Sequence, residues 1–342
     1  MRTVLTKFKQ ELTPNMNIVN RWLLALAPLA MSAASTAEPA LSLAPAASIE
    51  IPQSTGAFDF LRVDAKRNRL LAAHDKDGTA DYIDLQGNRL LARLKLGGAV
   101  DTAVDTDSKF YYVSVQDPGR VAVVDAETLK EVASVKTAGP TDAIIYEPKN
   151  HLVYVTHDDG TEVWVIDPAV RKVVATVAIP GAPEFMIYDE STDRIYLNIK
   201  DKDAVVVIDP AANKVVSQWS TLPAARPHGM ALDVKNHRIF SAGGNGKLVV
   251  IDAKTGKVTD SIEIAPKVDQ IALDAAGGIV YCAAPERMSV VRVVDGKLTR
   301  LGAVTTAATA KNVAVDQKTR AVWSTFTDGK SSFAKSWQPP KP

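Results

Sequence analysis

Ionisable residues recur at one position of this sequence, shortly before a series of apolar segments that each end in an acidic residue. The acidic residues that end the segments are Asp64, Asp105, Glu147, Asp189, Asp233, Asp274 and Asp316. The ionisable residues stand four residues before Asp105 and five before each of the others, and they are Asp59, Asp101, Asp142, Glu184, His228, Asp269 and Lys311. Carboxylates crowded into one place repel each other, which raises some of their pKa values and favours a bound metal ion or amine.

Three further residues are candidates for the same site. His74 and His157 lie at the same offset, at the end of the second apolar segment of their repeats, and Arg226 comes shortly before His228. His228 is the strongest single candidate because it replaces an acid at a mostly acidic position. A purely structural explanation stays open, because Asp favours turns at strand entries and a repeat copies its turn residues into every unit.

The spacing of these residues indicates a repeat of about 42 residues. A second series of acidic residues, each ending an apolar segment, keeps the same period and comprises Asp84, Asp125, Asp167, Asp209, Asp252 and Asp295. Each unit contains four short apolar segments separated by turn residues, which is typical of a β-propeller blade. Seven units predict an all-β, seven-bladed β-propeller of four-stranded antiparallel blades.

The seventh unit lacks one strand, and the missing strand is predicted at the other end of the chain. Residues Ser48–Ile51 read SIEI, and the same four letters close the fifth unit at Ser261–Ile264. An N-terminal strand that completes the last blade would close the ring and remove exposed sheet edges. We therefore expect a propeller over 47–337, preceded by a linker over 38–46 and followed by a tail over 338–342.

The first 37 residues are typical of a secretory signal peptide. Arg21 precedes the apolar run Trp22–Met31, and small residues follow up to Ala37. The run is shorter than the ~20 residues that a transmembrane helix needs, so no membrane span is expected after the signal is removed. Met16 would open a better-proportioned signal than Met1 does. The sequence thus predicts an exported, periplasmic protein.

Composition argues against several function classes. The chain has 40 Lys and Arg against 39 Asp and Glu, so the basic excess of a nucleic-acid-binding protein is absent. Cys282 is the single cysteine and lies in an apolar segment, where a small core residue is expected more often than a nucleophile. No P-loop, nucleophile elbow or zincin motif occurs.

The second strands of three units resemble a known repeat signature. Tyr111–Ser114, Val153–His157 and Ile195–Asn198 are similar to the Tyr-Val-Thr-Asn motif of the bacterial YVTN-repeat propellers. Gly181–Phe185 and Pro227–Asp233 resemble the exported, YncE-like members of that family. The resemblance covers nearly all of the chain after the signal and implies a periplasmic seven-bladed propeller, but it implies no catalytic residues.

Two main functions are compatible with these features. The first is a ligand-binding or protein-interaction scaffold whose polar, acidic channel mouth binds a small molecule or a protein partner; we expect a monomer. The alternative is a metal-dependent hydrolase or lactonase. Pro227–Gly229 resembles the loops of propeller lactonases, which implies a divalent metal such as Ca, Mg or Zn on Glu184, Asn198 and Asp269. A third hypothesis is a cofactor-bearing electron-transfer or maturation protein with His as an axial ligand, so enzymatic activity remains open.

Overall fold

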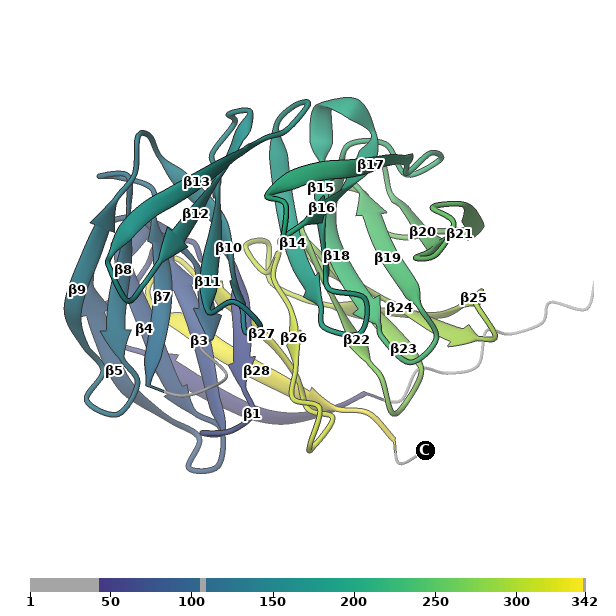
Figure 1. Cartoon of the computed structure of the whole chain (residues 1–342). Coiled ribbons are helices and arrows are strands. Elements are labelled where there is room, and N and C mark those ends of the chain that lie inside the picture. The colour runs from purple at the N-terminus through teal and green to yellow at the C-terminus, as the bar shows by residue number, and fades with distance from the viewer. Residues whose placement is uncertain (1–42, 105–108, 341–342) are drawn as a thin grey trace, which may run out of the picture. The chain divides into compact units, whose positions relative to one another are not determined.

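The computed structural model describes residues 43–104 and 109–340, and these residues form seven four-stranded antiparallel sheets. Each sheet is one blade, and Figure 1 shows the blades following one another along the chain. The predicted seven-bladed β-propeller is confirmed. The predicted signal peptide and residues 38–42 of the predicted linker lie outside the described residues, whereas 44–46 already belong to the first strand of the structure.

Within blades 1 to 6 the strands follow chain order from the innermost to the outermost. Blade 1 contains β2 (Leu61–Asp64), β3 (Arg69–His74), β4 (Thr79–Asp84) and β5 (Arg89–Lys95). Blade 2 contains β6 (Ala99–Val104), β7 (Phe110–Val115), β8 (Arg120–Asp125) and β9 (Lys130–Lys136). Blade 3 contains β10 (Thr141–Glu147), β11 (Leu152–His157), β12 (Glu162–Asp167) and β13 (Lys172–Ala178). Blade 4 contains β14 (Pro183–Asp189), β15 (Arg194–Ile199), β16 (Ala204–Asp209) and β17 (Lys214–Ser220).

Blade 5 contains β18 (Pro227–Asp233), β19 (Arg238–Gly243), β20 (Lys247–Asp252) and β21 (Val258–Glu263). Blade 6 contains β22 (Gln270–Asp274), β23 (Ile279–Ala284), β24 (Arg287–Val294) and β25 (Lys297–Thr305). Blade 7 contains β26 (Ala314–Val315), β27 (Val322–Thr327), β28 (Ser332–Gln338) and β1 (Ala44–Ile51). Two short 3-10 helices, η1 (Asp75–Asp77) and η2 (Lys200–Lys202), lie between the second and third strands of blades 1 and 4.

The residue pattern of each strand follows from its place in the blade. The third strand β16 is buried over Ala204–Ile208 because neighbouring blades cover both of its faces. The outermost strand β17 alternates between exposed and partly buried residues, because one of its faces meets solvent. A strand that is buried on both faces favours a continuous apolar run, as in β16, and a strand with one solvent-exposed face favours alternating apolar and polar residues, as in β17.

The N-terminal strand closes the ring. β1 pairs antiparallel with β28 from Ala44 opposite Gln338 to Ile51 opposite Ser332, and Figure 1 shows this first strand running beside the last. Ile51 is fully buried in a cluster that also contains Phe58, Leu61 and Trp323. The predicted closure is therefore confirmed, and the strand begins four residues before the predicted Ser48–Ile51 segment.

A glutamine joins the blades on either side of the short inner strand β26. The side chain of Gln270 accepts a hydrogen bond from Leu61 N at 3.1 Å and donates one to Leu61 O at 2.9 Å. It therefore links blade 6 to blade 1, and its oxygen also accepts a bond from Val313 N in blade 7. No helix in the described residues is long and apolar enough to cross a membrane.

Candidate functional site

The innermost strands of all blades run in the same direction around the ring, so their first residues lie at one end of the central channel. Asp142, Glu184 and His228 each lie at an irregularity of the inner strand, where one extra residue is accommodated. Such bulges re-aim a side chain relative to the regular pleat. We call this end of the channel the mouth, and the ends of the fourth strands and the joins between second and third strands lie on the same face.

Five of the seven predicted ring residues form a chain of ion pairs. Lys311 Nζ lies 3.6 Å from Asp59 and 2.7 Å from Asp269. His228 Nδ1 lies 3.8 Å from Asp269 and 3.4 Å from Glu184. Each of these two basic side chains therefore lies between acids from the blades on both of its sides, and opposite charges alternate around this part of the ring when His228 is protonated.

Lys200, in η2, extends this chain of ion pairs. Its Nζ lies 2.7 Å from both Glu184 and Asp159. The search for ionisable groups at strand starts missed Lys200, because it lies in the join between the second and third strands of blade 4. Lys200 lies one residue beyond the strand-end position that His74 and His157 occupy in their own blades, and that position was the signal that could have found it.

Asp142 is the ring acid that lacks a cationic partner in the described part of the chain. Its carboxylate is partly buried and makes neither an ion pair nor a hydrogen bond with any residue that the structure describes. Burial raises the pKa of Asp142 well above its ordinary value, and the negative charges of Glu184 and Asp59 raise it further. Asp142 is therefore a carboxyl group in blade 3 with which an added cation could pair.

The pKa values of Asp59, Glu184 and His228 depend on their burial and on the charged side chains beside them. Burial raises the pKa of Asp59 to about 7 despite the opposing charge of Lys311. Burial also acts to raise the pKa of Glu184, but His228 and Lys200 outweigh it, so that value is lowered. For His228, burial favours the neutral ring, but Glu184 and Asp269 outweigh this effect and raise the pKa.

Side chains cross the channel just behind the mouth. Phe60 of blade 1 and Phe185 of blade 4 have ring centroids 5.4 Å apart, although their blades lie three positions apart in the ring. The Arg62 guanidinium carbon lies 4.5 Å from the centroid of the Phe185 ring, a cation–π arrangement. These three side chains narrow the channel at this level, and no spacing in the sequence pointed to them.

Asp101 lies deeper than the other ring residues. Its carboxylate is fully buried and accepts two hydrogen bonds from Arg62, from Nε at 2.9 Å and from Nη2 at 2.6 Å. It also accepts hydrogen bonds from the backbone of Thr102 and of Ile144. Asp101 therefore connects blades 1, 2 and 3. Each of its two carboxylate oxygens already accepts two hydrogen bonds, so Asp101 is not available to a ligand at the mouth.

The two predicted histidines at the strand joins pack inside their blades. His74 is fully buried, and its ring nitrogens lie 2.9 Å from Asp81 Oδ2 and 2.9 Å from Gly56 O. His157 stacks on Trp164 with ring centroids 4.8 Å apart. The structure does not bring either ring into the chain of ion pairs.

The residues proposed as metal ligands point in different directions. The amide of Asn198 is fully buried, where Nδ2 donates to His228 O at 2.7 Å and Oδ1 accepts from Ser241 Oγ at 3.0 Å. Glu184 is already paired with Lys200 and His228. No group of three or more His, Cys, Asp or Glu side chains in the described residues is arranged to hold a metal ion. The described residues therefore fit a divalent metal poorly.

Arg226 lies at the edge of the mouth, beside an open pocket. This pocket has a volume of about 420 Å³ and is lined by Arg226, His228, Gly244, Asn245, Lys267, Val268, Asp269, Pro285 and Lys311. Arg226 is exposed, and its backbone N donates a hydrogen bond to Asp203 Oδ1 at 2.7 Å. Its guanidinium group forms no ion pair in the described residues. The structure therefore brings Arg226 together with three of the predicted ring residues.

Comparisons with known proteins agree on the fold. The family model for the cytochrome D1 heme domain matches residues 46–157, and that for the outer membrane protein assembly factor BamB matches residues 201–334. The chain is a β-propeller. Each match covers less than half of the chain, and the two families differ, so they support the β-propeller class and not one family within it.

Solved structures show the same architecture. The chain is similar to a chain of the Kuenenia stuttgartiensis hydrazine synthase, with a TM-score of 0.71 and 14% identity over 83% of this chain and 96% of that one. It is also similar to the WD40 repeats of RRP9, with a TM-score of 0.74 and 10% identity over 87% of this chain and 100% of that one. No curated protein matches the sequence. At these identities the structural similarity shows the fold alone.

Proposed function

We propose that this propeller is an exported, periplasmic binding protein of the YVTN-repeat, YncE-like kind, and that its channel mouth binds a small organic cation such as a protonated amine. The resemblance of the second strands to the YVTN motif and the apolar run Trp22–Met31 support the family and the location. Propellers serve many functions, so the ligand class rests on the mouth itself.

One observation carries the choice of a cation. Around the mouth, Lys311 and His228 each bridge two acids and Lys200 pairs with Glu184, whereas Asp142 has no cationic partner in the described residues. A bound ammonium group would pair with Asp142 and remove the unfavourable burial of an unpaired carboxylate. The aromatic and guanidinium side chains behind the mouth would limit how deep the ligand enters.

The proposal is tested by calorimetric titration of the chain from Glu38 to Pro342. The ligands are a panel of monoamines and diamines at pH 6 and pH 8. We expect an amine to bind more tightly at pH 8, because Asp59, whose pKa is raised to about 7, is protonated to a larger extent at pH 6, and the raised pKa of Asp142 acts in the same direction. Asp142→Asn should weaken binding by roughly ten-fold or more, which corresponds to about 1.4 kcal/mol.

The matched control is Glu190→Gln, which removes one negative charge from an exposed residue in the β14–β15 turn at the opposite end of the channel. It should bind the amine as the wild type does. Failure of every amine to bind, or equal affinities of Asp142→Asn and the wild type, would reject the mouth as a cation site.

A further inference from the structure

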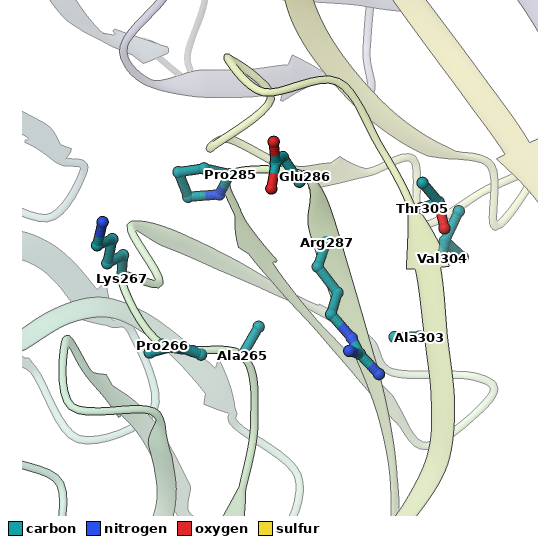
Figure 2. Close-up of a pocket in the computed structure, with 9 residues that line it drawn as sticks. All are labelled: Ala265, Pro266, Lys267, Pro285, Glu286, Arg287, Ala303, Val304 and Thr305. Atoms are coloured by element: carbon teal, nitrogen blue, oxygen red, sulfur yellow. The ribbon is translucent and has the colours of Figure 1, made fainter.

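A groove extends from the channel mouth outward between blades 5 and 6. The 420 Å³ pocket at the mouth shares Lys267 and Pro285 with a second pocket of about 590 Å³. Figure 2 shows the wall of this second pocket, which is built from the loop Ala265–Lys267, the turn Pro285–Arg287 and the end of β25. The two pockets are therefore adjacent on the mouth face, and we refer to them together as the groove.

Positive charge predominates in the groove. Four basic residues, Arg226, Lys267, Arg287 and Lys311, line it together with two acids, Asp269 and Glu286. Lys311 pairs with Asp269. Arg226, Lys267 and Arg287 are exposed, and their charged groups form no ion pair in the described residues.

Comparison among the blades shows that two of these cations are not required by the fold. Two residues before each ring residue, the seven blades carry Ala57, Ala99, Pro140, Ala182, Arg226, Lys267 and Thr309 in chain order. Long basic side chains thus occupy this position only in the two blades that flank the groove. Arg226 and Lys267 also have positive φ angles of 52° and 60°, a backbone region that favours Gly or Asn over long side chains.

Arg287 also differs from the equivalent residues of other blades, because those residues form ion pairs. The third strands β8 and β20 also begin with a basic residue, but Arg120 pairs with Glu131 and Lys247 pairs with Glu263. Arg287 begins β24 opposite Thr305 of β25, so its neighbouring strand supplies no carboxylate there. The groove therefore presents three cationic groups that are available to an external anion.

From these features we infer a second site, in which the groove between blades 5 and 6 binds an extended, acidic peptide segment of a protein partner. β25 is the outermost strand of blade 6, so backbone groups on its free edge can pair with an added strand. The lining contains no Phe, Tyr or Trp, the side chains on which nucleic-acid bases stack most strongly. A peptide carboxylate every second residue would face the same wall of the groove as the basic side chains do.

The test measures fluorescence anisotropy of a labelled peptide of alternating Glu and Ser, with a Gln and Ser peptide as the uncharged probe. The groove variant carries Arg226→Gln, Lys267→Gln and Arg287→Gln. Its matched control carries Lys130→Gln, Lys172→Gln and Lys214→Gln, three exposed residues that begin β9, β13 and β17 at the opposite end of the blades. Both variants lose three positive charges, so a general charge effect would change both equally.

We expect the acidic peptide to bind the wild type and the control variant alike, to bind the groove variant at least about ten-fold more weakly, and to bind less well as salt is raised. The uncharged peptide should not bind. Asp142→Asn should leave peptide binding unchanged, so this inference and the cation site can fail separately. Absence of peptide binding, equal losses in both triple variants, or tighter binding of citrate or an oligothymidine would overturn the assignment.

Discussion

The guanidinium group of Arg62 forms two parallel hydrogen bonds with the carboxylate of Asp101, at 2.9 Å and 2.6 Å, and so connects the inner strands of blades 1 and 2. Planar, bidentate pairs of this kind are the strong form of ion pair. Because Asp101 is fully buried, its charge is compensated by Arg62 together with the backbone N–H groups of Thr102 and Ile144.

Arg62→Ala is therefore expected to destabilise the protein strongly. The substitution leaves a buried carboxylate without its cation, which typically costs about 3–5 kcal/mol of unfolding free energy. Chemical denaturation measures the loss, with Arg292→Ala, an exposed arginine in β24, as the control. The double variant Arg62→Met with Asp101→Asn should recover part of the stability. A loss in Arg62→Ala no larger than that in the control would show that Asp101 does not need this partner.

Asp142→Asn should stabilise the protein at high pH and have little effect at low pH. The folded state raises the pKa of Asp142 above its unfolded value of about 3.9, so the folded state binds the proton more tightly. The unfolding free energy contributed by this group therefore falls as pH rises from about 4 toward the folded pKa. Asp59, with a pKa of about 7, gives the same sign between about pH 4 and 7.

Melting temperatures at pH 4 and pH 8 provide the measurement for Asp142→Asn. In a chain of this size each kcal/mol corresponds to at most about 2–4 °C. Glu190→Gln, at an exposed position, should show no difference between the two pH values. A melting temperature of Asp142→Asn that parallels the wild type at both pH values would contradict the raised pKa.

The N-terminal strand should contribute substantially to stability. Ile51 is fully buried against residues of blades 1 and 7, so Ile51→Ala should cost about 2–5 kcal/mol in denaturant unfolding. Ser48→Ala, at an exposed position of the same strand, should change stability little. A chain that starts at Thr55 should melt at a markedly lower temperature than one that starts at Glu38, and equal melting temperatures would refute closure by this strand in solution.

Cys282 should be unreactive in the native protein. Its side chain is fully buried in a cluster with Ala231, Val280 and Val291, and burial raises the pKa of the thiol above its usual range. Thiolate is the reactive form, so Ellman's reagent should detect no thiol before denaturation and one per chain after it. Rapid labelling of the native protein would mean that this part of blade 6 opens readily.

The repeat carried most of the information about the fold. Because every blade copies the same strand and turn pattern, the period alone predicted seven blades, and the repeated SIEI segment predicted the strand that completes the last one. The same period located ring residues at the starts of the inner strands. Lys311 and His228 each pair with acids of the two neighbouring blades. Which ring residues are neighbours follows from the order of the blades around the closed ring.

The rest of the site depended on details that spacing does not determine. Asp101 stands four residues before its marker, so it lies opposite Ser114 in the register and takes the place that the buried Ala143 has in blade 3. The contact between Phe60 and Phe185 joins strands from separate blades across the channel. Such a contact depends on side-chain length and rotamer, which a one-dimensional pattern does not contain.

The side chains of Phe60, Arg62 and Phe185 have one more consequence for how the molecule can work. Because Phe60 and Phe185 contact each other across the central channel and Arg62 packs on Phe185, these side chains narrow the passage between the two faces of the ring. A ligand at the proposed mouth site would therefore exchange with solvent mainly on the mouth face, and its residence time would depend on the loops of that face. A partner seated in the neighbouring groove would stand beside the mouth and could slow or hasten the exchange.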